Sequence, residues 1–427
     1  MATLLIVVFF LCLVLGIPIA FCLGLTSVVA VYMMDVPLRL IAQRMFTGMD
    51  SFPLMAVPFF VLAGDLMNVG GTTRGLINFA NVLVGRIRGG LAHTNIVASM
   101  FLAGISGSAV ADASAIASIM VPGMVKAGYG RGFAAALTAA SSTMGPIIPP
   151  SIFMVIMGVT TGVSIGALFA AGFIPGVLMG VSMMGLSYYL ARKRNYPKDP
   201  EPFSLERVWK AFVDAGPALL APVIIIGGIL GGIFTPTEAA VVAVFYALLV
   251  GVFYYRALNF RNIAQVIVSS ATTTAVLLFI IGSANVFAWV LTAEQIPQRI
   301  AAQMLALTRD PYLILLLINL FLIVVGMFME GGAAIIILAP TLMKVIETVG
   351  INPLHFGFIM VLNIVVGLLT PPMGVCLFVV SGVTGESLSN IIREVFPFIL
   401  VEIGVLLLAT YFPVVVMLIP RLLGYVQ

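Results

Sequence analysis

Apolar segments long enough to cross a bilayer follow one another along the chain. They begin with Leu4–Met34 and end with Val395–Ile419, and each exceeds the roughly 18 residues that span a hydrocarbon core. Backbone amides in lipid must be paired internally, which leaves helices or a closed barrel, and these runs lack the alternation of barrel strands. The pattern predicts an all-α integral membrane protein. The first run is expected to be a retained span, because it is too long for the apolar part of a signal peptide.

The pattern is interrupted where a membrane helix would be expected to continue, at Ser142–Phe153 (STMGPIIPPSIF). Pro149 and Pro150 have no amide hydrogen, so the carbonyl groups upstream of them lose their helical donors. Two half-helices that meet at a break also bring a positive and a negative dipole end into one small volume. Secondary transporters bind anions and cations in this way, whereas a single proline often only bends a helix. One break alone leaves both interpretations open.

A near-copy of this break lies 222 residues further along the chain, where Pro371-Pro372 matches Pro149-Pro150. The same offset aligns five further pairs of small residues: Gly104 with Gly326, Ala111 with Ala333, Ala117 with Ala339, Gly128 with Gly350 and Gly145 with Gly367. A proline pair shared inside two apolar runs indicates a structural repeat, and it favours binding-site breaks over simple kinks. We therefore predict a first inverted repeat at residues 1–190 and a second at 213–427.

Each repeat shows the same order of features. A hairpin of two short apolar arms is predicted at about 92–125 and again at about 312–347. Its Gly-rich tip can lie at mid-membrane depth only where protein or a water-filled cavity surrounds it. A long helix follows and breaks at the proline pair, at about 131–160 in the first copy and about 355–381 in the second.

A polar segment at 191–212 separates the two repeats. It holds six Lys and Arg residues and several prolines. Short basic connections face the cytoplasm under the positive-inside rule, so we predict a basic cytoplasmic linker here.

Composition supports this class of protein and excludes others. Hydrophobic residues make up 62% of the chain and charged residues 8%, which leaves too little polar surface for a water-soluble globule. The net charge of +4 comes from short connections, so nucleic-acid binding is not expected. No Walker loop, G-x-S-x-G elbow or H-E-x-x-H motif occurs, and the three cysteines lie apart. We therefore expect no enzyme activity, no metal other than Na⁺, and energy from an ion gradient or a partner.

Two carboxylates lie at the predicted hairpin tips, where an unpaired charge costs several kcal/mol. Asp112 and Glu330 could each help to bind Na⁺ or the substrate, or could instead cap a helix by accepting from backbone amides. They are not equivalent, because the repeat aligns Asp112 with Ala334 and Glu330 with Ser108.

Other charged residues have simpler interpretations. Asp65 is expected to be interfacial, because it lies near the end of its span. Glu238 is expected to cap a helix that begins after Pro236. His93 and His355 have no partner at a metal-binding spacing.

Four segments together resemble the large membrane subunit (M subunit, DctM-like) of tripartite ATP-independent periplasmic (TRAP) transporters. They are Gly104–Asp112 (GISGSAVAD), Gly145–Ser151 (GPIIPPS), Gly326–Ala334 (GMFMEGGAA) and Leu369–Gly374 (LTPPMG). The likeness covers essentially the whole chain. It implies a multi-pass protein of the bacterial inner membrane with the fold of the ion transporter superfamily, in which a mobile transport domain moves against a scaffold as an elevator.

The resemblance further implies Na⁺-coupled uptake of a small organic acid, with no cofactor besides the coupling ion. The implied partners, besides the lipid bilayer, are a small membrane subunit of four helices and a periplasmic solute-binding protein. Family substrates include C4-dicarboxylates and sialic acid; the likeness leans toward the sialic acid branch, although no side chain establishes it. Two alternatives stay open: a stand-alone dicarboxylate or citrate symporter of the same superfamily, and a gated anion channel.

Carried over by position, the resemblance implies two Na⁺ sites with a substrate site between them. The implied ligands of the first Na⁺ are Ser106, Gly107, Ser108, Thr143, Gly145 and Pro146, and those of the second are Glu330, Gly331, Gly332, Gly367 and Thr370. The implied substrate contacts are Ser106, Ser108, Asp112 and Ser151, beside helix breaks at Pro149, Pro150, Pro371 and Pro372. No arginine is near either tip in the sequence, so helix dipoles, hydroxyls and bound Na⁺ would balance the substrate charge.

Overall fold

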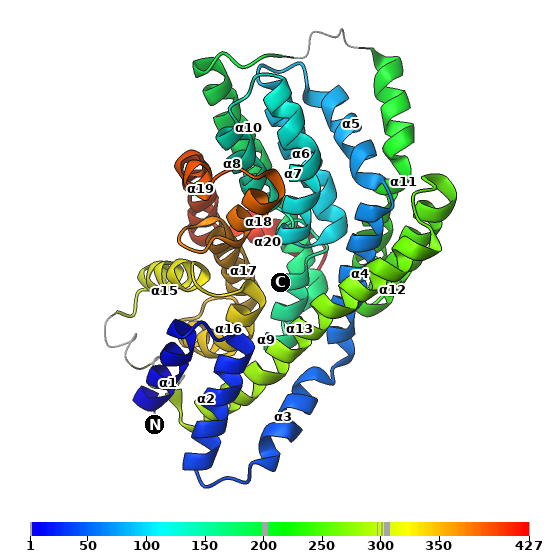
Figure 1. Cartoon of the computed structure of the whole chain (residues 1–427). Helices are drawn as coiled ribbons and strands as arrows, with labels where there is room; N and C mark the ends of the chain where they lie inside the picture. The colour runs from blue at the N-terminus through cyan, green and yellow to red at the C-terminus, as the bar shows by residue number, and fades with distance from the viewer. Residues whose placement is uncertain (1, 199–203, 297, 300–301, 303–307, 427) are drawn as a thin grey trace.

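Every regular element is helical in the part of the chain that the computed structural model describes, residues 2–426 apart from 199–203, 297, 300, 301 and 303–307 (Figure 1). Residues 199–203 of the predicted linker lie outside the described residues. The helices of the first half are α1 (Ala2–Val14), α2 (Ile19–Met33), α3 (Arg39–Met49), the 3₁₀ turn η1 (Phe52–Met55), α4 (Ala56–Val69), α5 (Thr72–Val84), α6 (Gly90–Ser106), α7 (Ala109–Lys126), α8 (Arg131–Ser142), α9 (Ile152–Thr161) and α10 (Ile165–Lys193).

The second half repeats much of this order. Its helices are α11 (Leu205–Leu230), α12 (Pro236–Leu249), the π-helical turn η2 (Val250–Tyr254), α13 (Phe260–Ala293), α15 (Pro311–Gly326), α16 (Gly331–Thr348), α17 (Pro353–Leu369), α18 (Val375–Thr384), α19 (Leu388–Tyr411) and α20 (Pro413–Leu422).

Several of these helices match the thickness of a membrane. In the described ranges, seven are long and apolar enough to cross it, and an eighth span results if α19 and α20, which meet at 63°, are counted together. Shorter apolar helices include α6, α9, α15 and α18, which belong to the hairpins and broken helices. The prediction of an all-α membrane protein is therefore confirmed.

Two helical hairpins pack against two broken helices. Hairpin α6–α7 contacts α8, and hairpin α15–α16 contacts α17. An asparagine on the first arm of each hairpin bonds to the broken helix: the Ser141 hydroxyl donates to Asn95 Oδ1 (2.9 Å), and Asn363 Nδ2 donates to Asn319 Oδ1 (3.0 Å). Ser141 and Asn363 occupy the same position of the repeat. The two copies thus join hairpin to helix at the same level.

Two long antiparallel helices, α10 and α19, lie beside both hairpins and their broken helices. Arg194, which follows α10, pairs with Glu394 near the start of α19 (2.8 Å). At the other end, α20 follows α19 and packs against α10. The two ends of this helix pair therefore serve as reference points for the orientation of the hairpins.

The two hairpins enter from opposite ends of this pair. The open end of α6–α7 lies beside the carboxyl end of α10, where the rings of Tyr129 and Tyr196 are 4.4 Å apart. The open end of α15–α16 lies beside the carboxyl end of α19, where the rings of Tyr312 and Tyr411 are 6.1 Å apart. This is the relation that inverted repeats require.

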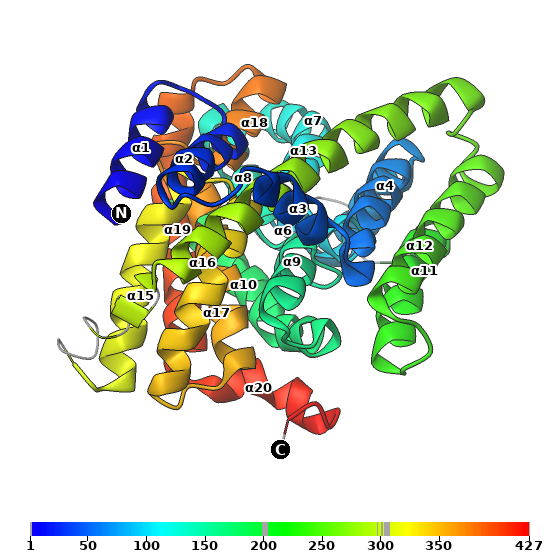
Figure 2. The same ribbon diagram turned by 90° about the horizontal axis from the view of Figure 1, so that it is seen from below.

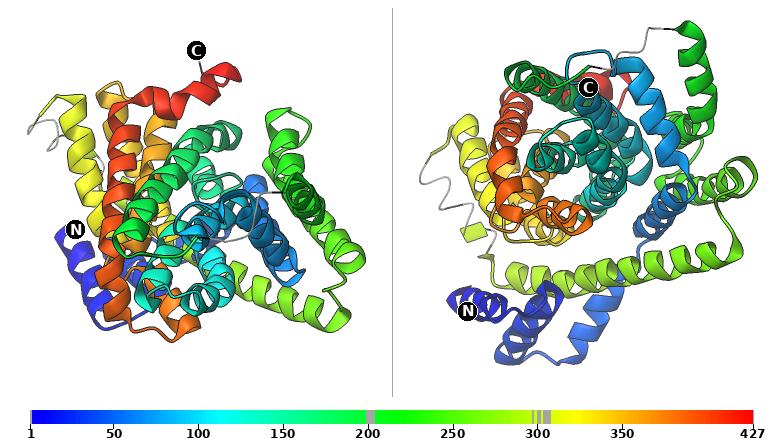
Figure 3. Two further views of the ribbon diagram at one scale, coloured as in Figure 1. Left: turned by 90° about the horizontal axis from the view of Figure 1, so that it is seen from above. Right: turned by 45° about the horizontal axis from the view of Figure 1, so that its top comes forward.

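The remaining helices form a frame, defined here as α1–α5 and α11–α13. The long α13 runs along one flank of the central cluster, with α2 and α3 on its outer side (Figure 3, right). Helices α11 and α12 pack mainly on α5 and α4, and α11 also contacts α6 of the first hairpin (Figure 2). Small residues allow the frame to approach the hairpins closely, since a methyl group on Gly64 of α4 would lie 3.1 Å from the Ser106 Cα.

Two glycines bring the second hairpin into backbone contact with its broken helix. A methyl group on Gly326 would lie 3.0 Å from the Gly367 Cα, and one on Gly367 would lie 2.5 Å from the Gly326 Cα. Both distances are too short for carbon atoms, so neither position tolerates a side chain without movement of the hairpin.

We predict that Gly367→Ala lowers the free energy of unfolding by about 1–3 kcal/mol, because the added methyl group must push α15 away from α17. Thermal unfolding of the detergent-purified protein measures the effect as a lower Tm. Gly404→Ala in α19 is the matched control, because a methyl group there meets open space. Equal Tm values for the two variants would contradict this close backbone contact.

Candidate functional site

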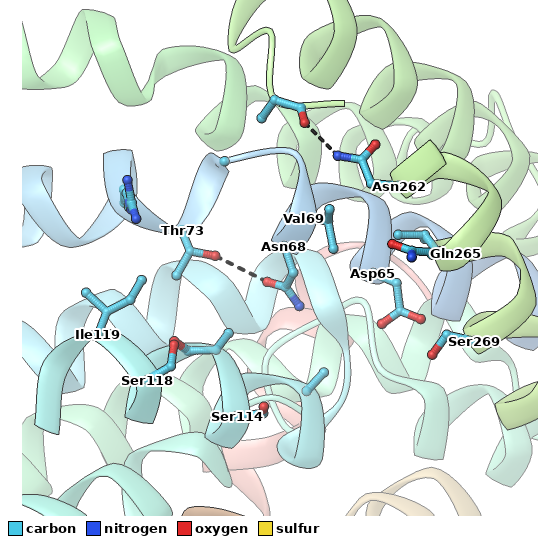
Figure 4. A pocket seen from close by; sticks show the side chains of 16 residues that line it. Asp65, Asn68, Val69, Thr73, Ser114, Ser118, Ile119, Asn262, Gln265 and Ser269 are labelled. Carbon is cyan, nitrogen blue, oxygen red and sulfur yellow. Dashed lines mark hydrogen bonds between the residues drawn. The ribbon is translucent and has the colours of Figure 1, made fainter. Parts of the chain in front are cut away.

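Two adjoining cavities lie between the frame and the hairpins. The outer cavity has a volume of about 690 Å³ and the inner one about 340 Å³. They share Asp65, Ala111, Ser114 and Ser269 in their walls. Asp65 from α4 and Ser269 from α13 lie on one side of the outer cavity, and Ser114 and Ser118 from α7 lie on the other (Figure 4).

Both hairpin tips reach the inner cavity. Its wall includes Ser106, Gly107 and Ser108 from the first tip, Pro146 from the first break and Glu330 from the second tip. The chain thus brings two segments more than 200 residues apart to one small polar space, as the repeat offset of 222 residues predicts.

The first tip is organised by hydroxyl groups. Gly107 ends α6 with φ +63°, a conformation that favours glycine, and Ser108 caps α7 by accepting from the Ala111 amide (3.4 Å). The Ser106 hydroxyl donates to Asp112 Oδ1 (2.5 Å) and accepts from the Ser108 amide (3.3 Å). The cap of α7 is therefore Ser108, and Asp112 has a different role.

Asp112 points away from the cavity and toward the first break. Its side chain is fully buried, and its Oδ2 has no hydrogen-bond partner among the described residues. A methyl group on Gly145 would lie 2.7 Å from this oxygen. Gly145 therefore leaves room for an unpaired carboxylate oxygen against the backbone of the break.

Prolines leave carbonyl groups unpaired at this break. The carbonyl oxygens of Thr143 and Gly145 accept no hydrogen bond from any described residue, because Pro146 and Pro149 lack the amide hydrogens that would reach them. The carbonyl of Pro146 accepts from the Ser151 hydroxyl (2.6 Å), and Ser151 also caps α9. Oxygen atoms without donors beside a buried carboxylate form a set that a small hard cation can use.

The second tip has the same cap position with a different residue. Glu330 caps α16, where its Oε2 accepts from the Ala333 amide (2.9 Å). Glu330 and Ser108, which align in the repeat, therefore perform the same structural task. Gly331 packs against the ring of Phe153, with no room for a side chain, and a methyl group on Gly332 would lie 3.1 Å from Glu330 Oε2.

The second break is shorter than the first. Helix α17 ends at Leu369, and Thr370 follows as its C-cap, with its hydroxyl donating to the Val366 carbonyl (2.7 Å). The Pro371–Pro372 peptide bond is cis, as is Pro149–Pro150. Each proline pair lies in the segment between two helices, α8 and α9 in the first copy and α17 and α18 in the second.

The implied substrate residues do not all lie together. Ser106 and Ser108 line the inner cavity, whereas Asp112 and Ser151 are fully buried outside its wall. Thr143 and Gly145 are likewise buried beside the first tip, and Gly367 beside the second. The geometry separates a cavity that a substrate could enter from buried oxygen groups next to it.

Other sequence interpretations are resolved by their contacts. Asp65 lines both cavities, and its Oδ2 accepts from the Ser270 hydroxyl of α13 (2.6 Å). Glu238 forms the expected capping box with Thr235. His93 Nε2 donates to the Arg88 carbonyl (3.3 Å), and His355 Nε2 donates to the Ala409 carbonyl (2.8 Å). No cluster of three His, Cys, Asp or Glu side chains occurs in the described ranges.

The model of the family described as "Tripartite ATP-independent periplasmic transporter, DctM component" matches residues 6–415. The chain belongs to this family. It is 43% identical, over 90% of each chain, to the Vibrio cholerae sialic acid TRAP transporter large permease protein SiaM. It is 42% identical, again over 90% of each, to the C4-dicarboxylate TRAP transporter large permease protein DctM of Pseudomonas aeruginosa.

One relative is longer than this chain. The isethionate TRAP transporter permease protein DctMQ of Oleidesulfovibrio alaskensis is 43% identical over 96% of this chain, which spans 65% of that protein. Large TRAP permeases are transporters of the inner membrane, so the predictions of a multi-pass inner-membrane transporter rather than an enzyme are confirmed.

Solved structures of other transporters share the fold. The crystal structure of the Alcanivorax borkumensis YdaH transporter gives a TM-score of 0.60 at 17% identity, covering 89% of this chain and 88% of that one. The Neisseria gonorrhoeae MtrF structure gives 0.53 at 15% identity, covering 87% and 83%. At such identities the likeness concerns the architecture alone.

One buried carboxyl group of this TRAP permease was missed in the sequence. Glu402 lies in α19, is fully buried, and its Oε1 is 2.6 Å from the Thr143 hydroxyl at the first break. The signal was present, because Glu402 is a lone acidic residue within the apolar run Val395–Ile419. Its partner was not predictable, because 259 residues separate the two.

We predict that a water-soluble thiol reagent modifies Ser114→Cys in the purified permease, because residue 114 is exposed in both cavities. Ser99→Cys is the control, since Ser99 is fully buried and bonded to Ser141. The native cysteines Cys12, Cys22 and Cys376 are buried and give a low background. Equal labelling at positions 99 and 114 would show that the cavity does not exist in the membrane protein.

Proposed function

We propose that this permease takes up a small organic anion, driven by Na⁺, by an elevator movement of the hairpins and broken helices against the frame. A periplasmic binding protein delivers the substrate, and a small four-helix membrane subunit completes the transporter. The observation that carries the proposal is the convergence of both hairpin tips and the first proline break on one cavity. The family and the relative named DctMQ support the partners.

The first Na⁺ site is proposed at the first break. The carbonyl oxygens of Thr143 and Gly145 lack donors, and Asp112 Oδ2 faces the same backbone. The tip residues 106–108 close the space from the cavity side. One carboxylate and several neutral oxygens match a single monovalent cation, because the site then carries no excess charge.

The second Na⁺ site is proposed between Glu330–Gly332 and Gly367–Thr370. Here the carboxylate also caps α16, so its charge is shared with the positive end of that helix. The second site is accordingly expected to be less anionic than the first.

The substrate is proposed to be an organic anion held in the inner cavity by Ser106 and Ser108. The relatives are named for sialic acid, C4-dicarboxylates and isethionate, which share a negatively charged acid group. Arg74 of α5 lies in the wall of the outer cavity and is its one cationic residue in the described part of the chain. It is placed to attract an anion, although it lies away from both tips.

The cavity is proposed to open toward the cytoplasm. The outer part lies along α7 between its tip and Lys126, and the open end of this hairpin contacts the linker region, where the Gly89 amide donates to the Pro197 carbonyl (3.0 Å). The basic residues of that linker indicate the cytoplasmic side. The structure would then represent an inward-facing arrangement.

We predict that proteoliposomes holding the permease, its small subunit and an external binding protein accumulate a labelled acid only when Na⁺ is higher outside. Sialic acid, succinate and isethionate are the acids to compare. Uptake without the binding protein would favour the stand-alone symporter. Equilibration without accumulation would favour the anion channel, and either result would contradict the proposal.

We predict that Asp112→Asn weakens Na⁺ binding at least about tenfold, or ~1.4 kcal/mol, because a neutral amide replaces the buried anionic oxygen. The Na⁺ dependence of Tm, with choline at constant ionic strength, measures the change in affinity. Asp50→Asn is the control, since Asp50 is an exposed carboxylate of the frame. Unchanged Na⁺ dependence in Asp112→Asn would remove Asp112 from the site.

A further inference from the structure

The inner cavity is shared by the two repeats. Three pairs of residues that are 222 positions apart have both members in its wall: Ser108 with Glu330, Pro146 with Leu368 and Phe153 with Val375. A space lined by matching residues of two inverted repeats lies on the axis that relates them. The outer cavity lies to one side of this axis, so a counterpart is expected on the other side.

That counterpart is a pocket of about 240 Å³, called here the small pocket, between the frame and the second hairpin. Its walls come from α3, η1 and α13 of the frame and from α9 and α16. Three of its residues align in the repeat with residues of the outer cavity: Thr47 with Ser269, Ile336 with Ser114 and Pro340 with Ser118. The small pocket therefore occupies the position that the inverted repeat assigns to a second outer cavity.

The small pocket lies on the side of the inner cavity away from the linker. It borders α16 at Ile336 and Pro340, beyond the tip residue Glu330 and toward the open end of the second hairpin. That open end lies beside the carboxyl end of α19, where Tyr312 stacks near Tyr411. The pocket is thus on the side from which the binding protein is proposed to deliver the acid.

Two polar groups of the small pocket are free to bind a ligand. The Asn285 side chain and the Ser51 hydroxyl have no hydrogen-bond partner among the described residues. The hydroxyls of Thr47 and Thr160 are already used, because they donate to backbone carbonyls of their own helices at 2.5 Å and 2.8 Å. An amide and a hydroxyl can each donate to an oxygen atom of an acid group.

Both free donors belong to the frame. Asn285 of α13 packs directly on the backbone of α3, since a methyl group on Gly48 would lie 2.6 Å from Asn285 Cβ and 2.9 Å from its Nδ2. Ser51 lies between α3 and η1. Among the described residues, no charged side chain lines the pocket, so no carboxylate there repels an anion.

We propose that the small pocket is an entry site for the acid, in which the Asn285 amide and the Ser51 hydroxyl hold the acid group on the frame before the acid reaches the hairpin tips. This rests on the proposed uptake of an organic anion. The volume of about 240 Å³ equals that of about eight water molecules at ~30 Å³ each. The site therefore suits an acid of the size of succinate or isethionate.

The wall on α16 explains how the acid can leave this site. Ile336 and Pro340 replace the two serines that α7 presents to the outer cavity. The second hairpin offers no hydroxyl at these two positions, so it can move past the bound acid without breaking hydrogen bonds there. Frame hydroxyls continue along the path, because Ser269 and Thr273, the repeat counterparts of Thr47 and Ser51, line the inner cavity.

Protection of an introduced cysteine tests the site. Thr47→Cys places a thiol at an exposed position in the pocket wall and leaves both proposed donors in place, while the native cysteines are buried. We expect succinate and isethionate to slow the modification of the purified Thr47→Cys permease by a water-soluble thiol reagent. The neutral diamide succinamide should leave the rate unchanged. No protection by either acid, or equal protection by succinamide, would overturn the proposal.

A change of charge at Asn285 tests its role. Asn285→Asp keeps the shape of the side chain but replaces the donor with a negative charge. Combined with Thr47→Cys, it should raise the succinate concentration for half-protection at least about tenfold, as expected for loss of a hydrogen bond to a charged group. Gln295→Glu is the matched control, because it adds the same charge at an exposed position just beyond α13. An unchanged half-protection concentration in Asn285→Asp would overturn the role of Asn285.

Two further variants keep the result unambiguous. If Asn285→Asp does not fold, Ser51→Ala removes the other donor without adding charge and should also raise the half-protection concentration; no rise would overturn the proposal. In the Ser114→Cys permease, Asn285→Asp should leave the modification rate unchanged, because residue 114 lines the other two cavities. A changed rate at position 114 would show that Asn285 acts on the whole arrangement and would overturn its role as a ligand.

Protection is measured at equilibrium and needs neither a Na⁺ gradient nor a partner protein. Failure of gradient-driven uptake with intact protection at position 47 would contradict the proposed function alone. Intact uptake without protection at position 47 would contradict the entry site alone.

Discussion

Pairing of backbone polar groups is the constraint on which this structure depends. In a membrane interior every N–H and C=O needs a partner, and a continuous helix meets that need by itself. The two proline pairs remove donors inside apolar helices, so other groups must complete the backbone. Serine hydroxyls, the Glu330 carboxylate and the hairpin tips do this in part. The carbonyls of Thr143 and Gly145 stay unpaired, and this is the basis for the cation site proposed at the first break.

The two repeats share architecture but differ in charge. Ser108 and Glu330 both cap the second arm of a hairpin, and Ser141 and Asn363 both bond to an asparagine of the first arm. Asp112, however, aligns with Ala334, so the second copy has no carboxylate at the position from which Asp112 faces the proline break. The inverted arrangement therefore relates the positions of the two proposed sites, while individual side chains set the charge of each.

The backbone features were predictable from the sequence because prolines and glycines act locally. A proline pair in an apolar run indicates a broken helix without knowledge of its neighbours. Gly107 and Gly145 likewise mark, from the sequence alone, backbone positions that carry no side chain. Orientation was not predictable in this way. Asp112 faces Gly145 rather than the cavity, and Asp65 lies in the cavity wall, because helix packing decides which face of each helix is covered. Glu402 contacts a residue in the other half of the chain, 259 residues away, and no local pattern predicts that contact.

Binding of radioactive sodium to the permease with both Pro149→Ala and Pro150→Ala tests most directly whether unpaired backbone carbonyls hold the cation. The alanine at position 149 restores the amide donor that the Gly145 carbonyl lacks, and both changes leave every side chain of the proposed first site in place. The account predicts that this double variant remains folded but loses one of the sodium ions bound by the wild-type protein. Wild-type sodium binding by the folded double variant would contradict it.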